Sequence, residues 1–365
     1  MNRYLDFYKY TAITADEERP RHSEASIIEL KDGSLLMAWQ CHLKSGFGSG
    51  DEAPSNISLM NSYDGARTWV NERIVAEMKG NCINVYSPSF LRNKDGSISL
   101  YFKRYINIDF HSDGTLNNYY RITSYDEGKT WSEEETIWEM SKFGVMNHAI
   151  KRLSDGSALM PLEGGNGGWR KDKPNYEVFV MRSEDDFKTF TESERMTVPM
   201  RGLMEPCIAE RSDGSLNMVF RTQLGSIFYS ESFDKGRTWT NPQTTGLHAP
   251  ESCPCIVSIP NTDAQLIIWN NSEYDMKWRS HYGKRTPLTM AISTDGLKTF
   301  GDFFDIETDP NWAFTNPSVT VTSDGLFVLN YWACKYNEEW LFGPLIDLKI
   351  ATFRINCEGL RKEEK

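Results

Sequence analysis

Short apolar runs, each interrupted by an Asp-Gly pair, recur along the chain. The first runs are Ala25-Ser-Ile-Ile-Glu-Leu30 and Ser34-Leu-Leu-Met-Ala-Trp39, on either side of Asp32-Gly33. Short apolar runs joined by such a turn are typical of β-hairpins. Successive turns lie 50 to 63 residues apart, at Asp32-Gly33, Asp95-Gly96, Asp155-Gly156, Asp213-Gly214, Asp263-Ala264 and Asp324-Gly325.

A second turn signature alternates with the first and has the pattern Ser-x-Asp-x-x-x-Thr-aromatic. Its Ser and Asp side chains can accept hydrogen bonds from the backbone amides of a tight turn. Only the second and fourth copies carry Gly at the fifth position, so we expect the other three to turn slightly differently. The five copies span Ser62–Trp69, Ser124–Trp131, Ser183–Phe190, Ser232–Trp239 and Ser293–Phe300.

The two signatures together predict four strands per repeat and six repeats. Six four-stranded antiparallel units closed into a ring form a six-bladed β-propeller, which leaves few sheet edges exposed. We therefore expect an all-β fold, with residues 1–365 forming a single propeller domain. A β-sandwich with incidental turns is the alternative, and the ordered spacing of the turn signals disfavours it.

Composition narrows the possible partners and the compartment. A net charge of −11 argues against nucleic acid or an anionic membrane as a partner, so an anionic ligand would need a local cluster of Arg or Lys. The seven Cys show no paired C-x-x-C motif, which favours free thiols and predicts no metal site.

Targeting and assembly are less constrained by the sequence. Charged residues near Met1 replace the apolar core of a signal peptide, and no apolar run approaches ~20 residues. We expect a cytoplasmic protein that does not span a membrane, or a secreted or periplasmic one if a leader has been removed. No cofactor is indicated, and the oligomeric state is left open.

Aligning the repeats on the Asp of each Asp-Gly turn predicts a polar ring at one end of the channel. Hairpin symmetry brings the residues eight before and eight after this Asp to the same end, although the exact strand register is left open. Polar residues at one level around a channel are what a ligand site needs. The two sets are Glu24, Ser87, Asn147, Glu205, Cys255 and Asn316, and Gln40, Lys103, Glu163, Arg221, Asn271 and Trp332.

The Ser-x-Asp-x-Gly-x-Thr-Trp pattern is the Asp-box (BNR) repeat, and the chain resembles the sialidase superfamily over nearly its whole length. Residues 205–221 are similar to the sialidase segment that supplies the glutamate partnering the nucleophile and one arginine of a carboxylate-binding triad. The resemblance implies these roles for Glu205 and Arg221. It implies further triad arginines at Arg285 and, two residues out of step, at Arg21. Asp51, or its neighbour Glu52, resembles the acid/base aspartate.

One position departs from the sialidase pattern. The tyrosine nucleophile of the family corresponds to Asn316, which cannot attack an anomeric carbon as a phenolate can. Tyr331, Tyr336 or Tyr282 would have to reach the site from elsewhere. We therefore expect a relative that acts on another acidic sugar, such as a uronic acid, rather than a strict sialidase.

The sequence as a whole predicts a glycoside hydrolase acting on an acidic carbohydrate. Hydrolysis needs one protonated acid and one base or nucleophile, for which we choose Glu205 and Asp51, with Glu24 and Glu163 in reserve. A histidine, His148 or His22, is an alternative acid or base. The expected substrate-binding residues are Arg21, Glu24, Asn147, Arg221, Arg285 and Asn316.

Two other functions stay open at this point. A polysaccharide lyase would use His148 or a tyrosine to abstract a proton beside a uronate carboxylate. A non-catalytic glycan-binding propeller would share the same fold, because a fold does not dictate a function.

Overall fold

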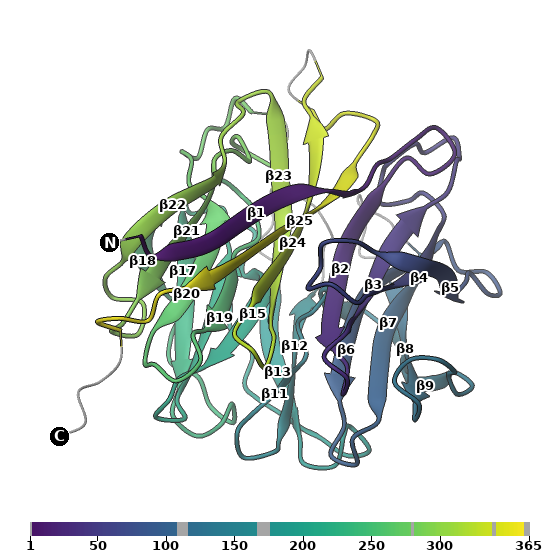
Figure 1. Ribbon diagram of the computed structural model, residues 1–365, viewed down its shortest axis with the longest axis horizontal. Helices are drawn as coiled ribbons and strands as arrows, with labels where there is room; N and C mark the ends of the chain where they lie inside the picture. Colours follow the sequence, from purple (N-terminus) through teal and green to yellow (C-terminus); the bar gives the residue numbers. More distant parts are fainter. Residues whose placement is uncertain (1, 108–115, 166–175, 279–280, 338–340, 361–365) are drawn as a thin grey trace.

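Six antiparallel sheets are arranged as the blades of a propeller in the computed structural model (Figure 1). It describes residues 2–107, 116–165, 176–278, 281–337 and 341–360. Strands make up 53 % of the structure, and these residues form no helix. Accordingly, the described part of the chain offers no helix that could cross a membrane. The predicted fold class is confirmed.

Each blade runs from an innermost to an outermost strand in chain order, with one exception at ring closure. In the third blade the innermost strand is divided into two short pieces, β10 and β11. Blade 1 consists of β2 (His22–Glu29), β3 (Leu35–His42), β4 (Ser55–Ser62) and β5 (Val70–Ala76); blade 2 of β6 (Asn84–Arg92), β7 (Ile98–Asn107), β8 (Leu116–Ser124) and β9 (Glu135–Ser141). Blade 3 consists of β10 (Phe143–Gly144), β11 (Lys151–Arg152), β12 (Ala158–Gly164), β13 (Glu177–Ser183) and β14 (Thr191–Glu192); blade 4 of β15 (Met204–Glu210), β16 (Leu216–Arg221), β17 (Ser226–Ser232) and β18 (Gln243–His248). Blade 5 consists of β19 (Cys255–Ser258), β20 (Gln265–Asn270), β21 (Leu288–Ser293) and β22 (Gly301–Glu307); blade 6 of β23 (Trp312–Val321), β24 (Phe327–Lys335), β25 (Asp347–Ile355) and β1 (Tyr4–Ile13).

The ring is closed by the first strand of the chain. Strand β1 pairs antiparallel with β25 and so becomes the outermost strand of the sixth blade (Figure 1). This explains why six hairpin turns, five Asp-Gly and one Asp263-Ala264, accompany only five Asp boxes. An Asp box joins the third and fourth strands of a blade, and in blade 6 these two strands lie at opposite ends of the chain.

All five Asp boxes have the same turn, so our expectation of different turns where Gly is absent is wrong. The fifth residue has positive φ in each copy, including Ala66 (62°), Phe187 (61°) and Leu297 (68°). Its N–H donates to the Ser hydroxyl at 2.8 to 3.0 Å in every copy. The Asp carboxylate also accepts the Thr N–H each time. These bonds hold the left-handed backbone for which glycine had appeared necessary.

The apolar core lies between neighbouring blades rather than on the axis. Successive residues of a strand face opposite sides of its sheet, and here both sides are covered by the adjacent blades. Six main buried clusters each combine residues of two adjacent blades. The innermost strand ends are therefore free to carry polar side chains around the axis.

Candidate active site

Five blades carry an irregular residue on their innermost edge. This residue has left-handed backbone, with φ between 50° and 54°, although it is not glycine. In four blades it interrupts the strand ladder, as where Met204 pairs with Arg221 but the next regular pair is Cys207 with Val219. Such strained positions are concentrated at functional sites. The five residues are Glu24, Ser87, His148, Glu205 and Asn316.

The positions aligned eight residues before each turn Asp therefore match the irregular inner residue in four blades, and they do not match it in the other two. In blade 3 the irregular residue is His148 rather than Asn147, because the innermost strand is divided there. In blade 5, Cys255 pairs regularly with Ile268 at the start of a short strand. The interruption at Glu205 also resolves the register that the sequence left open.

A cavity of about 610 Å³ opens where these strand ends meet. It is lined by seven of the nine predicted site residues: Arg21, Glu24, Asp51, Glu205, Arg221, Arg285 and Asn316. Asn147 and His148 line a separate cavity of about 30 Å³ instead.

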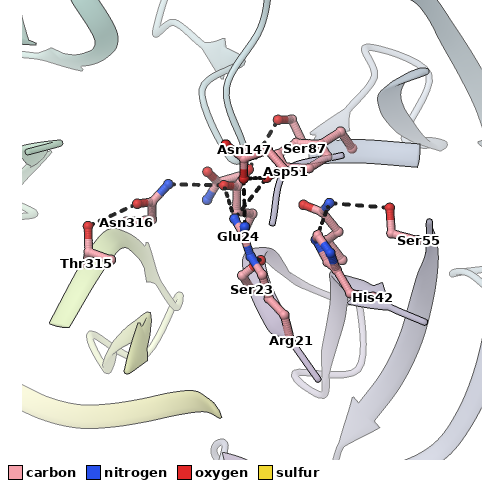
Figure 2. Close-up of polar contacts among 12 residues, drawn as sticks. Arg21, Ser23, Glu24, His42, Asp51, Ser55, Ser87, Asn147, Thr315 and Asn316 are labelled. Atoms are coloured by element: carbon pink, nitrogen blue, oxygen red, sulfur yellow. Dashed lines mark hydrogen bonds and ion pairs between the residues drawn. The ribbon is translucent and has the colours of Figure 1, made fainter. Parts of the chain in front are cut away.

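Arg21 holds two carboxyl groups at once. Its Nη1 donates to Asp51 Oδ1 at 2.7 Å, and its Nη2 donates to Glu24 Oε1 at 3.3 Å. The Tyr86 hydroxyl donates to the same Asp51 oxygen at 2.7 Å. Figure 2 shows Arg21 extending towards Glu24 and Asp51, while Asn316 reaches Glu24 from another strand. The Asn316 Nδ2 lies 3.2 Å from Glu24 Oε1. Residues of blades 1, 2 and 6 are therefore joined around one guanidinium.

Arg221 is held between two glutamates. Its Nη1 donates to Glu205 Oε1 at 2.9 Å, and its Nη2 lies 3.3 Å from Glu251 Oε1. Arg201 also pairs with Glu251, and Gln223 donates to the other oxygen of that carboxylate at 3.2 Å. The predicted pairing of Glu205 with Arg221 is present, within a larger buried network.

Two glutamates of the cavity have strongly raised pKa values. Burial raises the pKa of Glu24 to about 7, although the Arg21 charge opposes the shift. Burial and the neighbouring Glu205 raise the pKa of Glu163 to about 7. Both therefore exchange protons near neutral pH, as acid-base catalysts must.

Asp51 behaves in the opposite way. Burial disfavours its charge, but the Arg21 guanidinium and the Tyr86 hydroxyl together hold the pKa of its carboxyl below the ordinary value. Asp51 is thus the ionised member of the pair that shares Arg21.

Arg285 is a buried cation of the cavity that is held mainly by neutral acceptors. Its side chain donates to the Thr315 hydroxyl and, at 3.1 Å, to the Glu251 carbonyl oxygen, while Nε has no partner among the described residues. No described carboxylate forms an ion pair with it. Burial and the nearby Arg221 charge lower its pKa. A ligand anion would relieve this charge.

The histidines proposed as acid or base lie outside the main cavity. His148 Nδ1 is 3.0 Å from the Ser26 hydroxyl and its Nε2 is 3.0 Å from the Val319 carbonyl oxygen. It therefore connects blades 3, 1 and 6 as a structural residue. His22 is fully buried, and its Nδ1 accepts from the Trp39 indole at 3.1 Å.

The three tyrosines considered as replacements for Asn316 do not line the cavity either. Tyr331 donates to Glu307, and the Tyr336 hydroxyl accepts the backbone N–H of Arg285. Tyr282 is also absent from the lining, although its neighbour His281 belongs to it.

Sequence reasoning missed several residues of the site. Tyr86, Tyr105, Tyr176 and Phe342 line the cavity, and Glu251 supports its arginines. Tyr86 directly precedes the ring position Ser87 and could have been found from it. Glu251 lies in a connection before β19 where no repeat signal marks it. Within the described residues, no three His, Cys, Asp or Glu side chains gather as a metal site requires.

Comparison with solved structures relates this propeller to sialidases. A protein of unknown function from Dyadobacter fermentans matches with a TM-score of 0.71 and 17 % identity, over 96 % of this chain and 99 % of the other. The NanB sialidase of Streptococcus pneumoniae matches with 0.72 and 12 %, over 95 % and 70 %. The intramolecular trans-sialidase of Ruminococcus gnavus matches with 0.70 and 16 %, over 97 % and 98 %. The TM-scores show a shared fold, and at these identities the likeness shows the fold alone.

A search of curated protein sequences gives no match. The sequence profile of the BNR repeat-like domain, however, matches residues 33–329. That segment begins within the first Asp-Gly turn and extends into the last blade, and it contains all five Asp boxes. The chain belongs to the BNR repeat-like domain family and has the sialidase-like six-bladed propeller fold.

Proposed function

We propose that this protein is a glycoside hydrolase that acts on an acidic glycan, one that contains a sialic or uronic acid. The observation that carries the proposal is the cavity itself. There Arg285, a buried cation with no described carboxylate partner, is brought together with the arginine-paired carboxyl groups of Asp51 and Glu205. Solved neighbours that are sialidases and trans-sialidases support the same class of chemistry. Asn316 argues for an acidic sugar other than the usual sialidase substrate.

The cavity can perform each task that such a reaction requires. Arg285 and Arg221 can bind a sugar carboxylate, because a guanidinium donates to both of its oxygens at once. The aromatic rings of Trp332 and Phe342 can cover the apolar faces of a sugar. Carboxyl groups from blades 1, 3 and 4 supply the acid-base chemistry that breaks the bond.

The proposal is tested by incubating the protein with aryl glycosides and acidic oligosaccharides and measuring sugar release. Once a substrate is found, Arg285→Lys should raise KM by about 30-fold, since about 2 kcal/mol of charged hydrogen bonding is lost. For a neutral analogue of the same sugar, the wild type and Arg285→Lys should have almost the same KM. Glu205→Gln should lower kcat by about 100-fold, because it removes the charge paired with Arg221 inside the cavity.

Full activity in both variants would contradict this assignment of the site. An unsaturated product that absorbs ultraviolet light would identify a polysaccharide lyase instead. Glycan affinity without turnover on any substrate would identify a binding propeller. Of the bases considered for a lyase, His148 is disfavoured, because both of its ring nitrogens are within hydrogen-bond distance of protein atoms, and a tyrosine base stays open.

A further inference from the structure

Asn316, which the resemblance to sialidases matches to their tyrosine nucleophile, carries an amide that contacts an acid. Asn316 Nδ2 donates to Glu24 Oε1 at 3.2 Å, and both residues occupy the irregular inner position of their blades. The Asn316 oxygen accepts from the Cys253 thiol at 3.2 Å and from the Thr315 hydroxyl at 3.1 Å. These two donors fix the amide so that its NH₂ group faces Glu24. Asn316 is therefore a positioning residue for a carboxyl group.

Glu24 is built to accept hydrogen bonds. Three donors converge on its carboxyl group: Arg21 and Asn316 on Oε1, and the Ser87 hydroxyl on Oε2 at 3.3 Å. The side chain is 4 % exposed and lines the cavity. Donors of this kind favour the carboxylate form, against the effect of burial. The result is a carboxyl group that can accept a proton from water.

Glu163 is built to keep a proton. Its Oε2 accepts the backbone N–H of Glu205, which favours the charged form, but burial and the Glu205 carboxyl group, ion-paired with Arg221, outweigh this bond. No described group donates to its other oxygen, Oε1. A second negative charge beside Glu205 is unfavourable, so Glu163 is the neutral member of this pair. The buried ammonium of Lys103 interacts with Glu24 and Glu163 alike.

We propose that Glu24 is the general base and Glu163 the general acid of this enzyme, and that Asn316 positions Glu24 in place of a tyrosine nucleophile. The inference rests on the proposed function. Glu163 delivers its proton to the glycosidic oxygen as the bond from that oxygen to the anomeric carbon breaks. Glu24 takes a proton from the water whose oxygen forms the new bond to that carbon. Exchange with solvent then gives Glu163 a proton again and removes the proton from Glu24. A single displacement by water inverts the anomeric configuration.

Other charged groups tune the two glutamates from several blades. Those around Glu24 are Arg21, Asp51, Lys103 and Glu205; those around Glu163 are Glu205, Lys103 and Arg221. Asp51 and Glu205 are ion-paired with Arg21 and Arg221 and act on the reaction through charge. The two carboxyl groups that exchange protons are thus the ones that sequence reasoning kept in reserve.

The test uses the substrate identified with the wild-type protein, so inactivity of the wild type would overturn the proposed function first and this inference with it. Glu24→Gln and Glu163→Gln should each lower kcat by about 100-fold or more, with little change in KM. Glu307→Gln, at a buried glutamate outside the cavity, should keep wild-type kcat. Circular dichroism checks the fold of each variant.

Three further readouts separate chemistry from structural damage. Glu163→Gln should regain activity on an aryl glycoside whose leaving group needs no proton. Azide should rescue Glu24→Ala and give a glycosyl azide of inverted configuration. Asn316→Asp should move the acidic limb of the pH profile to higher pH, because the new charge raises the pKa of Glu24.

The proposal is overturned if the wild type is active and both glutamine variants keep its kcat. It is also overturned if the first-formed product retains configuration, as a covalent intermediate on Tyr86 or another residue would require.

Discussion

One guanidinium at the centre of the site holds two carboxyl groups that differ in their affinity for protons. Arg21 contacts Asp51 at 2.7 Å and Glu24 at 3.3 Å. The closer carboxyl, which is also bonded to Tyr86, stays ionised, while the other has a pKa of about 7. Neighbouring acids with diverging pKa values are how one site supplies both a proton carrier and a fixed charge.

The raised pKa of Glu24 predicts a pH-dependent cost to stability. The ordinary pKa of 4.5 applies to the unfolded chain and about 7 to the folded one. Between these values the folded protein keeps the proton that the unfolded chain releases, so the contribution of Glu24 to stability falls as pH rises. Glu24→Gln has no such proton. In urea unfolding, the free energy of unfolding of the variant relative to the wild type should therefore increase by up to about 3 kcal/mol between pH ~4 and pH ~8.

Asp51→Asn provides the opposite control. The folded-state pKa of Asp51 is lowered, so its carboxylate contributes stability at neutral pH, and that contribution is lost as the pH falls through the folded pKa. The variant should lose stability relative to the wild type as pH rises from the acid range. A Glu24→Gln difference that does not change with pH would contradict the raised pKa.

At the scale of elements, what the sequence predicted depended on local signals. The hairpins and Asp boxes were predictable because each turn is specified by residues a few positions apart. Glu24, Glu205 and Asn316 followed by counting from those turns. In blade 3 the count gave Asn147 instead of His148, because the innermost strand is divided there. Glu251 was missed because its partners come from other parts of the chain.

The choice of glycine within an Asp box reflects the neighbouring blade. A Cβ atom on Gly128 would lie 2.5 Å from a side-chain carbon of Leu36, whereas Ala66 and Leu297 fill space at the same turn position. The same backbone thus accepts a side chain wherever the adjacent blade leaves room for one.

This difference predicts unequal costs for two substitutions with similar backbone angles. Gly128→Ala, at φ +80°, should lower the free energy of unfolding by about 3 kcal/mol, from left-handed strain plus overpacking against Leu36. Gly33→Ala, at φ +83° with nothing within 4 Å of the new Cβ, should cost only the strain, about 1 kcal/mol. Equal losses in urea unfolding would show that blade packing does not select the glycine.

For the whole molecule, the placement of the core explains how such distant sequences share one architecture. The six main apolar clusters lie between blades, so the fold needs only apolar strands and correctly placed turns. The axis is left to residues that packing does not dictate. Neighbours at 12 to 17 % identity can therefore keep the ring while the residues at its centre change the chemistry.

Ring closure is the part of this architecture that depends on a single strand. Tyr4 of β1 is 5 % exposed, donates to the Asp302 carbonyl oxygen at 2.6 Å, and lies with its ring 5.3 Å from that of Phe304 in blade 5. Tyr4→Ala removes a buried ring at the junction of blades 5 and 6, so it should lower the free energy of unfolding by about 4 kcal/mol. Tyr8→Ala, at a 43 % exposed position on the same strand, should cost less than about 1 kcal/mol.

Because blades 5 and 6 supply Arg285 and Asn316, the activity of the Tyr4 variant should disappear in the same urea range as its tertiary structure. A Tyr4 variant as stable as the Tyr8 variant would mean that pairing of β1 with β25 closes the ring without this side chain.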